Sequence, residues 1–146
     1  MSGFTDLPAY QPLILFSALL VLKMGAVAFA TANRRRLAGV VVNPEDVMVN
    51  PGSHAGDSDA PEVLRAKRAH LNDLENIPGF LVLATLFTLS GASATAGWAY
   101  FGVYFASRTL HTIMYLAGKQ PWRTASFFVG QLTMLGVIVQ LLMSAF

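Results

Sequence analysis

The chain of 146 residues is long enough for one domain, and its 54% apolar and 12% charged residues, against about 25% charged in a soluble domain, indicate an integral membrane protein. The absence of cysteine excludes disulfides, thiolate metal ligands and a cysteine nucleophile, so any thiol chemistry must use the sulfur of a small molecule. The basic residues are clustered and the three histidines are scattered, which argues against a nucleic-acid partner and against a metal site.

Four apolar segments follow one another along the chain, at about 12–32, 77–90, 98–117 and 125–146. A helix needs about 20 residues to cross a hydrocarbon core of about 30 Å. The first, third and fourth segments reach this length. The second reaches it only if its helix begins near Pro61 and includes the charged stretch RAKRAHLNDLEN that precedes the apolar residues.

The residues around Pro61 favour this longer second helix. Proline suits the first turn of a helix, and Asp59 just before it is a candidate cap. Pro78-Gly79 predicts a kink where polar sequence gives way to apolar sequence. We therefore predict an all-α fold, an integral membrane four-helix bundle in a single domain. The predicted helices lie at about 10–36, 61–91, 96–118 and 122–146 of the domain 1–146.

The distribution of basic residues predicts how the helices are oriented. The loops at 33–62 and 118–124 contain Arg34, Arg35, Arg36, Lys119 and Arg123, whereas the N-terminus, the 91–97 turn and the C-terminus contain no Lys or Arg. Basic loops of membrane proteins stay in the cytoplasm. We expect both basic loops there and both termini on the opposite side, in a bacterial inner membrane or the endoplasmic reticulum.

Polar side chains form one stripe on each of the second and third helices. At helical spacing on the second helix stand Arg65, Arg68, Asn72 and Glu75, and on the third Arg108, His111 and Tyr115. An ionisable group at membrane depth costs at least a few kcal/mol unless it faces the bundle interior or water. If the two stripes face each other, they line a mostly cationic cavity that suits a small anionic zwitterion.

Structural explanations remain open for some of these charges. Lys23, deep in the first helix, needs a carboxylate partner, for which Asp73 or Glu75 is suited. Lys67 lies near a helix end, so its side chain is more simply expected to extend to the membrane surface and keep its charge in water. Tyr115 is equally consistent with an interfacial belt of aromatic residues.

Longer strings of sequence resemble a known family. These strings are KM at 23–24, VNPED at 42–46, RAHLNDLENIPGF at 68–80, RTLHTIMYL at 108–116 and WRTASFFVGQ at 122–131. They are similar to the MAPEG superfamily, the membrane-associated proteins in eicosanoid and glutathione metabolism. The similarity is greatest to the microsomal glutathione transferase branch, which is related to microsomal prostaglandin E synthase.

The resemblance implies a homotrimer that binds glutathione between neighbouring subunits, near the cytoplasmic face. Carried over by position, the implied glutathione-binding residues are Arg35, Arg68, His70, Asn72, Glu75, Arg108, His111, Tyr115 and Arg123. Arg108 is implied to support the site from the third helix, whereas Lys23 and Asp73 are implied to be internal structural charges.

The resemblance also implies the chemistry. Arg123, at the start of the fourth helix, is expected to face the sulfur and favour its thiolate, and the Thr124 hydroxyl to donate a hydrogen bond to it. Asp46 either orients Arg123 or caps a turn. The acceptor is a lipophilic electrophile that arrives from the bilayer between the first and fourth helices. The expected activity is glutathione transfer, with peroxidase activity toward lipid hydroperoxides as a further expectation.

Departures from the prostaglandin E synthase branch favour the transferase. That branch carries Arg where Leu71 stands, Tyr where Phe127 stands and Ser where Thr124 stands, and a common family Glu is replaced by Leu64. Two alternatives stay open. One is a glutathione-dependent isomerase of an endoperoxide lipid, and the other is a non-catalytic membrane regulator or a small transporter.

Overall fold

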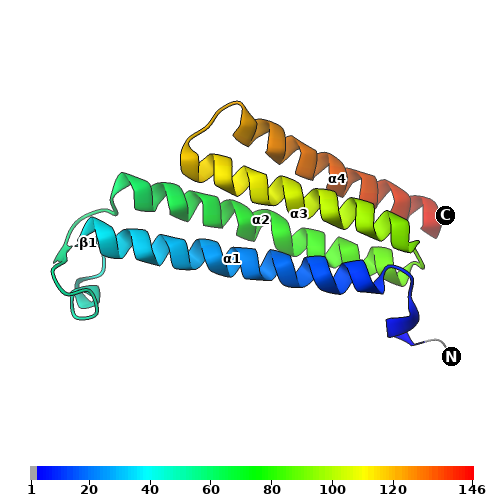
Figure 1. The fold of residues 1–146 in the computed structure, drawn as a ribbon, viewed down its shortest axis with the longest axis horizontal. Helices are drawn as coiled ribbons and strands as arrows, with labels where there is room; N and C mark the ends of the chain where they lie inside the picture. The colour runs from blue at the N-terminus through cyan, green and yellow to red at the C-terminus, as the bar shows by residue number, and fades with distance from the viewer. Residues whose placement is uncertain (1–2) are drawn as a thin grey trace.

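The computed structural model describes residues 3–146, and within them four long helices account for most of the chain (Figure 1). They are α1 (Tyr10–Ala38), α2 (Pro61–Leu89), α3 (Ala94–Ala117) and α4 (Trp122–Ala145), preceded by a short 3-10 helix, η1 (Phe4–Asp6). The all-α prediction is confirmed, and each helix begins and ends within two residues of the predicted position.

The four helices lie side by side with α1 and α4 on opposite edges of the bundle (Figure 1). Helix α1 packs against α2 and α3, and α4 packs against α3 and α2. Short turns at residues 90–93 and 118–121 force α2, α3 and α4 into antiparallel neighbours. In a single chain, therefore, α2 and α3 separate α1 from α4.

Helices α1 and α4 are long and apolar enough to cross a membrane. Helix α3, at 24 residues, has the length that the sequence predicted, but it does not reach the apolar character of α1 and α4 by this measure. Small and polar side chains along its length, together with Arg108 and His111, lower its apolar character. Helix α2 carries its charges in its first half, as the sequence indicated.

Aromatic rings of α2 and α3 fill the centre of the bundle. The rings of Phe80 in α2 and Tyr104 in α3 are stacked with centroids 3.6 Å apart, and Phe101 meets Phe80 edge to face at 5.8 Å. Leu20 of α1 and Val137 of α4 complete this core. Elsewhere many large apolar side chains are exposed on the single chain, as expected of helices that face lipid or another chain.

Helix α2 begins at Pro61 and continues through Pro78 to Leu89 as one helix. Its cap differs from the prediction. Ala60 occupies the capping position and no side chain accepts a hydrogen bond from the first turn, so the predicted cap by Asp59 was wrong. The carboxylate of Asp59 has other partners, described below.

The segment between α1 and α2 has local structure of its own. It contains a parallel pair of two-residue strands, β1 (Val40–Val41) and β2 (His54–Ala55), and a 3-10 helix, η2 (Pro44–Val47). Gly39 ends α1 with a φ of 67°, a left-handed conformation that glycine adopts without strain. The segment therefore forms a folded cap on one end of the bundle.

Candidate functional site

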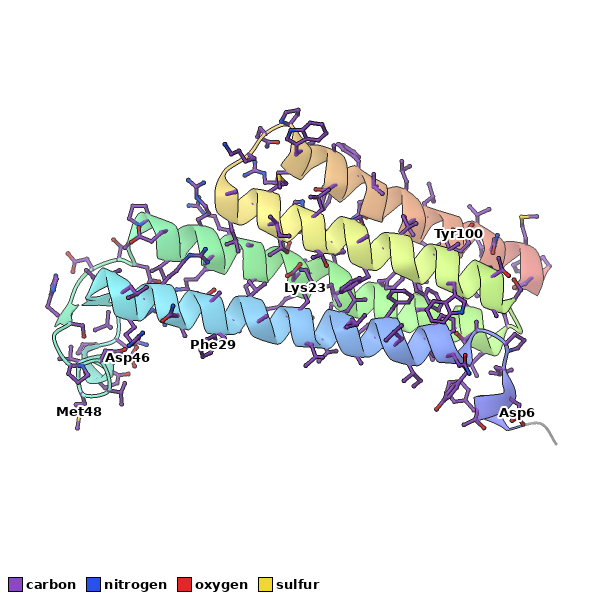
Figure 2. All side chains as sticks on the ribbon, viewed as in Figure 1. Asp6, Lys23, Phe29, Asp46, Met48 and Tyr100 are labelled. Carbon is purple, nitrogen blue, oxygen red and sulfur yellow. The ribbon has the colours of Figure 1, made fainter. Side chains whose placement is uncertain are left out.

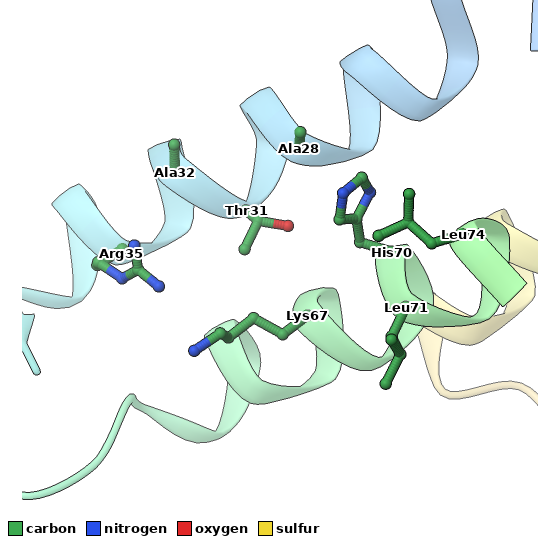
Figure 3. A pocket seen from close by; sticks show the side chains of 8 residues that line it. All are labelled: Ala28, Thr31, Ala32, Arg35, Lys67, His70, Leu71 and Leu74. Carbon is green, nitrogen blue, oxygen red and sulfur yellow. The ribbon is translucent and has the colours of Figure 1, made fainter. Parts of the chain in front are cut away.

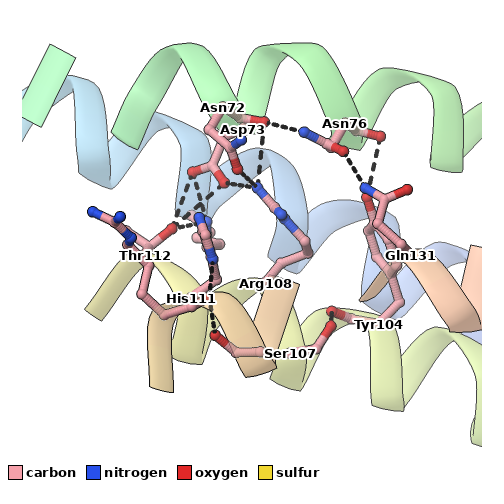
Figure 4. A network of polar contacts seen from close by, with 12 residues as sticks. Asn72, Asp73, Asn76, Tyr104, Ser107, Arg108, His111, Thr112 and Gln131 are labelled. Carbon is pink, nitrogen blue, oxygen red and sulfur yellow. Dashed lines mark hydrogen bonds and ion pairs between the residues drawn. The ribbon is translucent and has the colours of Figure 1, made fainter. Parts of the chain in front are cut away.

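A network of charged and polar side chains lies buried between α1, α2 and α3 (Figure 4). The ammonium of Lys23 lies 2.6 Å from Oδ2 of Asp73, and Nη2 of Arg108 lies 3.1 Å from Oδ1 of the same carboxylate. Lys23 also donates to Thr112 Oγ1 at 2.7 Å. The expectation that Lys23 is paired with an acidic residue of α2 is confirmed, and the partner is Asp73 rather than Glu75.

Arg108 connects this network to Asn72. Its Nη2 donates to the side-chain oxygen of Asn72 and, at 3.3 Å, to the backbone oxygen of the same residue. The Arg108 side chain is 1% exposed, and its Nε and Nη1 have no hydrogen-bond partner among the described residues. Within one chain, Arg108 therefore supports Asn72 from inside the bundle.

A second polar group joins α2 to α4 near the same depth (Figure 4). The Gln131 amide donates to the side-chain oxygen of Asn76, and the Tyr104 hydroxyl donates to the Asn76 backbone oxygen at 3.1 Å. Asn76 in turn donates to the Asn72 backbone oxygen at 2.7 Å. Neither Asn76 nor Gln131 is among the residues predicted from the sequence, although both belong to the strings that carry the family resemblance.

Three predicted site residues meet where α3 ends and α4 begins. The guanidinium carbon of Arg123 lies 4.7 Å from the centre of the Tyr115 ring, a cation–π contact. Nδ1 of His111 lies 2.8 Å from the backbone oxygen of Arg123, and the His111 and Tyr115 rings meet edge to face at 5.7 Å. Two aromatic residues of α3 thus hold Arg123 in the first turn of α4.

Thr124, the next residue of α4, is exposed and is hydrogen-bonded to Gln120. The Thr124 hydroxyl and Oε1 of Gln120 are 3.0 Å apart. When the oxygen and nitrogen of the Gln120 amide are exchanged, its nitrogen donates to the Thr124 hydroxyl and its oxygen accepts from Nη2 of Arg123 at 2.7 Å. The three residues form a small polar cluster that faces out of the chain.

The polar stripe of α2 is mostly exposed on the single chain. Arg68 and Glu75 are exposed and Asn72 is half-buried. Of the two stripes, only Asn72 and Arg108 are joined by hydrogen bonds within residues 3–146. The two stripes therefore do not enclose a common cavity within one chain, because most of the α2 stripe faces outward.

A cavity of about 430 Å³ lies between α1 and α2 (Figure 3). It is lined by Ala28, Thr31, Ala32, Arg35, Lys67, His70, Leu71 and Leu74. His70 lies on the side of α2 away from Asn72, since residues two apart on a helix point about 200° apart. Its Nδ1 is buried without a hydrogen-bond partner in the described structure. Two predicted binding residues, Arg35 and His70, are thus gathered here.

Asp59 fixes two of the basic residues of this cavity. Its Oδ1 accepts from Arg35 Nε at 3.0 Å and its Oδ2 from Lys67 Nζ at 2.7 Å, and its side chain is 1% exposed. Burial opposes ionisation of this carboxyl, but the hydrogen bonds from Arg35 and Lys67 outweigh it and hold the pKa of Asp59 below its usual value. This role of Asp59 was not predicted from the sequence. Lys67, for which the sequence predicted a position at the membrane surface, is half exposed and is also ion-paired.

Asp46 lies far from the start of α4 within the chain. Figure 2 places it within the 39–60 segment at the end of the bundle, while the α3–α4 turn lies on the other edge. Asn43 Nδ2 donates to its carboxylate at 3.3 Å, and Asn50 donates to its backbone oxygen. Two roles were predicted for Asp46. Its contacts within one chain agree with the role in which it stabilises a turn.

Comparison with known proteins gives the family of this chain. A model of the MAPEG family matches residues 13–143. The chain is 35% identical to prostaglandin E synthase of Homo sapiens over 139 residues, which cover 94% of this chain and 91% of that protein. It is 37% identical to microsomal glutathione S-transferase 1 of Homo sapiens over 135 residues, which cover 88% and 86%. A prostaglandin E synthase of Mus musculus is 36% identical over 137 residues, covering 93% and 87%. The chain belongs to the MAPEG family.

Proposed function

We propose that the protein is a membrane-bound glutathione transferase. It binds glutathione, favours the thiolate form of its sulfur and transfers it to lipophilic electrophiles. The similarity to a microsomal glutathione S-transferase over most of both chains supports this proposal. So does the sequence, which contains no cysteine and must take a sulfur nucleophile from a small molecule.

The observation that carries the proposal is the position of Arg123. Its cation is held over the Tyr115 ring in the first turn of α4, with the exposed Thr124 hydroxyl beside it. A thiol with an ordinary pKa of about 8.5 ionises more readily beside an arginine and a helix N-terminus. A sulfur that contacts Arg123 is therefore kept as the thiolate at neutral pH.

The positions of the predicted binding residues support an assembly of several copies as the active form, and the family resemblance implies that it is a homotrimer. Arg35 and His70 line the α1–α2 cavity, whereas Arg123 lies at the start of α4, on the opposite edge of the chain (Figure 1). Arg68 and Glu75 are exposed. A single site that uses these residues together needs α1 and α2 of one copy beside α4 of the next. Such a site opens toward lipid between α1 and a neighbour's α4.

The transfer step needs activation and proximity rather than a cofactor metal. The thiol proton leaves to solvent as the sulfur binds near Arg123. The sulfur lone pair then forms a bond to the electrophilic carbon. In a substitution, the leaving group departs with the electron pair of its bond to that carbon. In an addition, the π electron pair of the activated double bond moves to the neighbouring atoms and takes up a proton. With a lipid hydroperoxide, two glutathione molecules supply two electrons and become the disulfide, and the products are an alcohol and water.

A second candidate function is isomerisation of an endoperoxide lipid. The 35% identity to prostaglandin E synthase over most of the chain favours it. Leu71, where that branch carries Arg, and Phe127, where it carries Tyr, favour the transferase instead. A non-catalytic regulator is the weaker alternative, since Glu75, Tyr115 and Arg123 are all present. We place the basic loops on the cytoplasmic side.

The deciding experiment is a thiolate absorbance titration of the detergent-purified protein with glutathione. Because the chain has no cysteine, any thiolate signal belongs to the ligand. We expect a saturable signal at neutral pH that disappears in Arg123→Ala while the assembly survives. Binding without thiolate overturns the activation mechanism, and no binding overturns the enzyme assignment.

Turnover then separates the two enzyme functions. A chloronitroaromatic and a prostaglandin endoperoxide are offered to the same preparation, each with saturating glutathione. Conjugation of the chloronitroaromatic supports the transferase. Turnover of the endoperoxide alone identifies the protein as the isomerase.

A further inference from the structure

The contact with Asp59 leaves the two terminal nitrogens of Arg35 available to bind a ligand. Of the three guanidinium nitrogens of Arg35, only Nε donates to the Asp59 carboxylate, and the two terminal nitrogens, Nη1 and Nη2, make no hydrogen bond within the described residues. The Arg35 side chain is 28% exposed. Two parallel N–H groups at the tip of a guanidinium match the two oxygens of a carboxylate. Arg35 is therefore held by its base and presents its fork to a second anion.

The charges at the α1–α2 cavity favour an anion (Figure 3). Arg35, Lys67 and His70 lie among apolar walls contributed mainly by alanine and leucine side chains of both helices. His70 adds a buried Nδ1 that has no partner in the described structure. Asp59 is not one of the lining residues. It thus fixes the basic groups without presenting its own negative charge to the cavity.

We propose that Asp59 is a positioning residue of the glutathione site, which orients Arg35 to bind a carboxylate of glutathione at the α1–α2 cavity. The assignment rests on the proposed function. Asp59 does not contact the ligand and acts only through Arg35 and, on its other oxygen, Lys67.

The contacts of Asp59 with Arg35 and Lys67 favour ligand binding because both cations are carried by long, flexible side chains. An arginine or lysine that is free in solution loses rotamer freedom when it binds a ligand, and this loss weakens the affinity. The buried carboxylate of Asp59 fixes both side chains before the ligand arrives. It also ties the end of α1 to the start of α2, the two elements that form the cavity walls.

The test compares two ligands and matched variants by calorimetric titration of the full-length assembly. Glutathione is compared with its dimethyl ester, in which both carboxylates are replaced by uncharged methyl esters. The variant Asp59→Asn removes the charge that Arg35 and Lys67 need. Asp57→Asn is the control, because Asp57 is an exposed acidic residue two positions away with no hydrogen bond in the described structure.

We expect Asp59→Asn to weaken glutathione binding about tenfold and ester binding hardly at all, since only glutathione offers a carboxylate to Arg35. Arg35→Ala should lose as much, and the double variant no more than either. In turnover assays, Asp59→Asn should raise the KM for glutathione about tenfold and leave kcat unchanged. Asp57→Asn should match the parent protein.

Three outcomes overturn the assignment. Equal losses for glutathione and its ester mean that Asp59 acts on the fold alone, and an unchanged glutathione affinity means that Arg35 needs no positioning. Both leave the glutathione transferase proposal standing. Failure of the parent protein to bind glutathione overturns the proposed function and this assignment with it. If Asp59→Asn does not fold, Asp59→Glu replaces it, because its extra methylene displaces Arg35 while keeping the charge. It should lose affinity for glutathione severalfold and none for the ester.

Discussion

The ammonium of Lys23 in α1 lies 2.6 Å from a carboxylate oxygen of Asp73 in α2, and both side chains are almost fully buried. The other oxygen of Asp73 accepts from Arg108 of α3. One carboxylate is therefore paired with cations from two neighbouring helices. Charges buried away from water are tolerated only when paired in this way, so Asp73 links three helices at the centre of the bundle.

This arrangement predicts unequal effects of removing the two partners of the pair. Asp73→Asn leaves Lys23 and Arg108 as buried cations without a counter-charge, and we expect it to cost about 3–5 kcal/mol of stability. Lys23→Met leaves Asp73 paired with Arg108, so its cost should be clearly smaller. Thermal unfolding of both variants in detergent micelles checks the order. A Lys23→Met variant that is the less stable of the two would show that Arg108 does not neutralise Asp73.

The Tyr115 ring predicts a second difference, this time in thiolate formation. Tyr115→Phe keeps the ring under Arg123, whereas Tyr115→Leu removes it. A cation–π contact contributes about 0.5–2 kcal/mol, so the leucine variant should lose thiolate signal at a given glutathione concentration severalfold, and the phenylalanine variant less than twofold. The absorbance titration used for Arg123→Ala measures both. Equal losses in the two variants would assign the effect to the hydroxyl instead of the ring.

The lowered pKa of Asp59 predicts how its contribution to stability varies with pH. Its hydrogen bonds from Arg35 and Lys67 favour the ionised form in the folded state. A depressed carboxyl pKa stabilises the fold above the unfolded value of about 3.9, and this contribution is lost as the pH falls through the still lower folded value. The stability difference between the parent protein and Asp59→Asn should therefore be constant from pH 8 to 5 and shrink below about pH 4. Unfolding midpoints across this range measure it. A difference that already shrinks between pH 7 and 5 would contradict the assignment to Asp59.

Sequence periodicity predicted the helices well because the signals are local. Segment length, apolar content and the proline at position 61 set the helix bounds, and all of them can be read within one segment. Lys23 was paired with an acidic residue of α2 because a buried cation requires a counter-charge. The choice of Asp73 over Glu75 depended on which face of α2 meets α1, and this became visible only in the packed bundle.

The parts that could not be predicted depend on contacts between distant segments. Asp59 precedes a helix and has the sequence of a cap, yet its partner Arg35 lies 24 residues earlier, and the two are brought together by the path of the segment between α1 and α2. The separation of Arg35 from Arg123 follows from the order in which the helices pack, which periodicity does not report. The resemblance to the family implied that Arg35 and Arg123 belong to one site. It did not say which copy of the chain supplies each of them.

Gly118 predicts a further test, in which Gly39 is the matched control. Both glycines end a helix with a φ of 67°. Alanine at either position should cost about 1 kcal/mol, because a Cβ is strained in the left-handed region. Only at Gly118 would the new Cβ also run into a neighbouring side chain, the guanidinium of Arg65, while open space surrounds the one at Gly39.

Displacing Arg65 removes a cation from the carboxyl end of α3, where it is favourable by about 0.3–1 kcal/mol. Gly118→Ala should therefore be more destabilising than Gly39→Ala by about this amount, and the difference should vanish in an Arg65→Ala background. Thermal unfolding is measured for Gly118→Ala and Gly39→Ala, each in the parent protein and in the Arg65→Ala background. The parent protein and Arg65→Ala alone are the references. Equal costs for the two glycine variants in the parent background would show that Arg65 moves aside freely and contributes nothing at the end of α3.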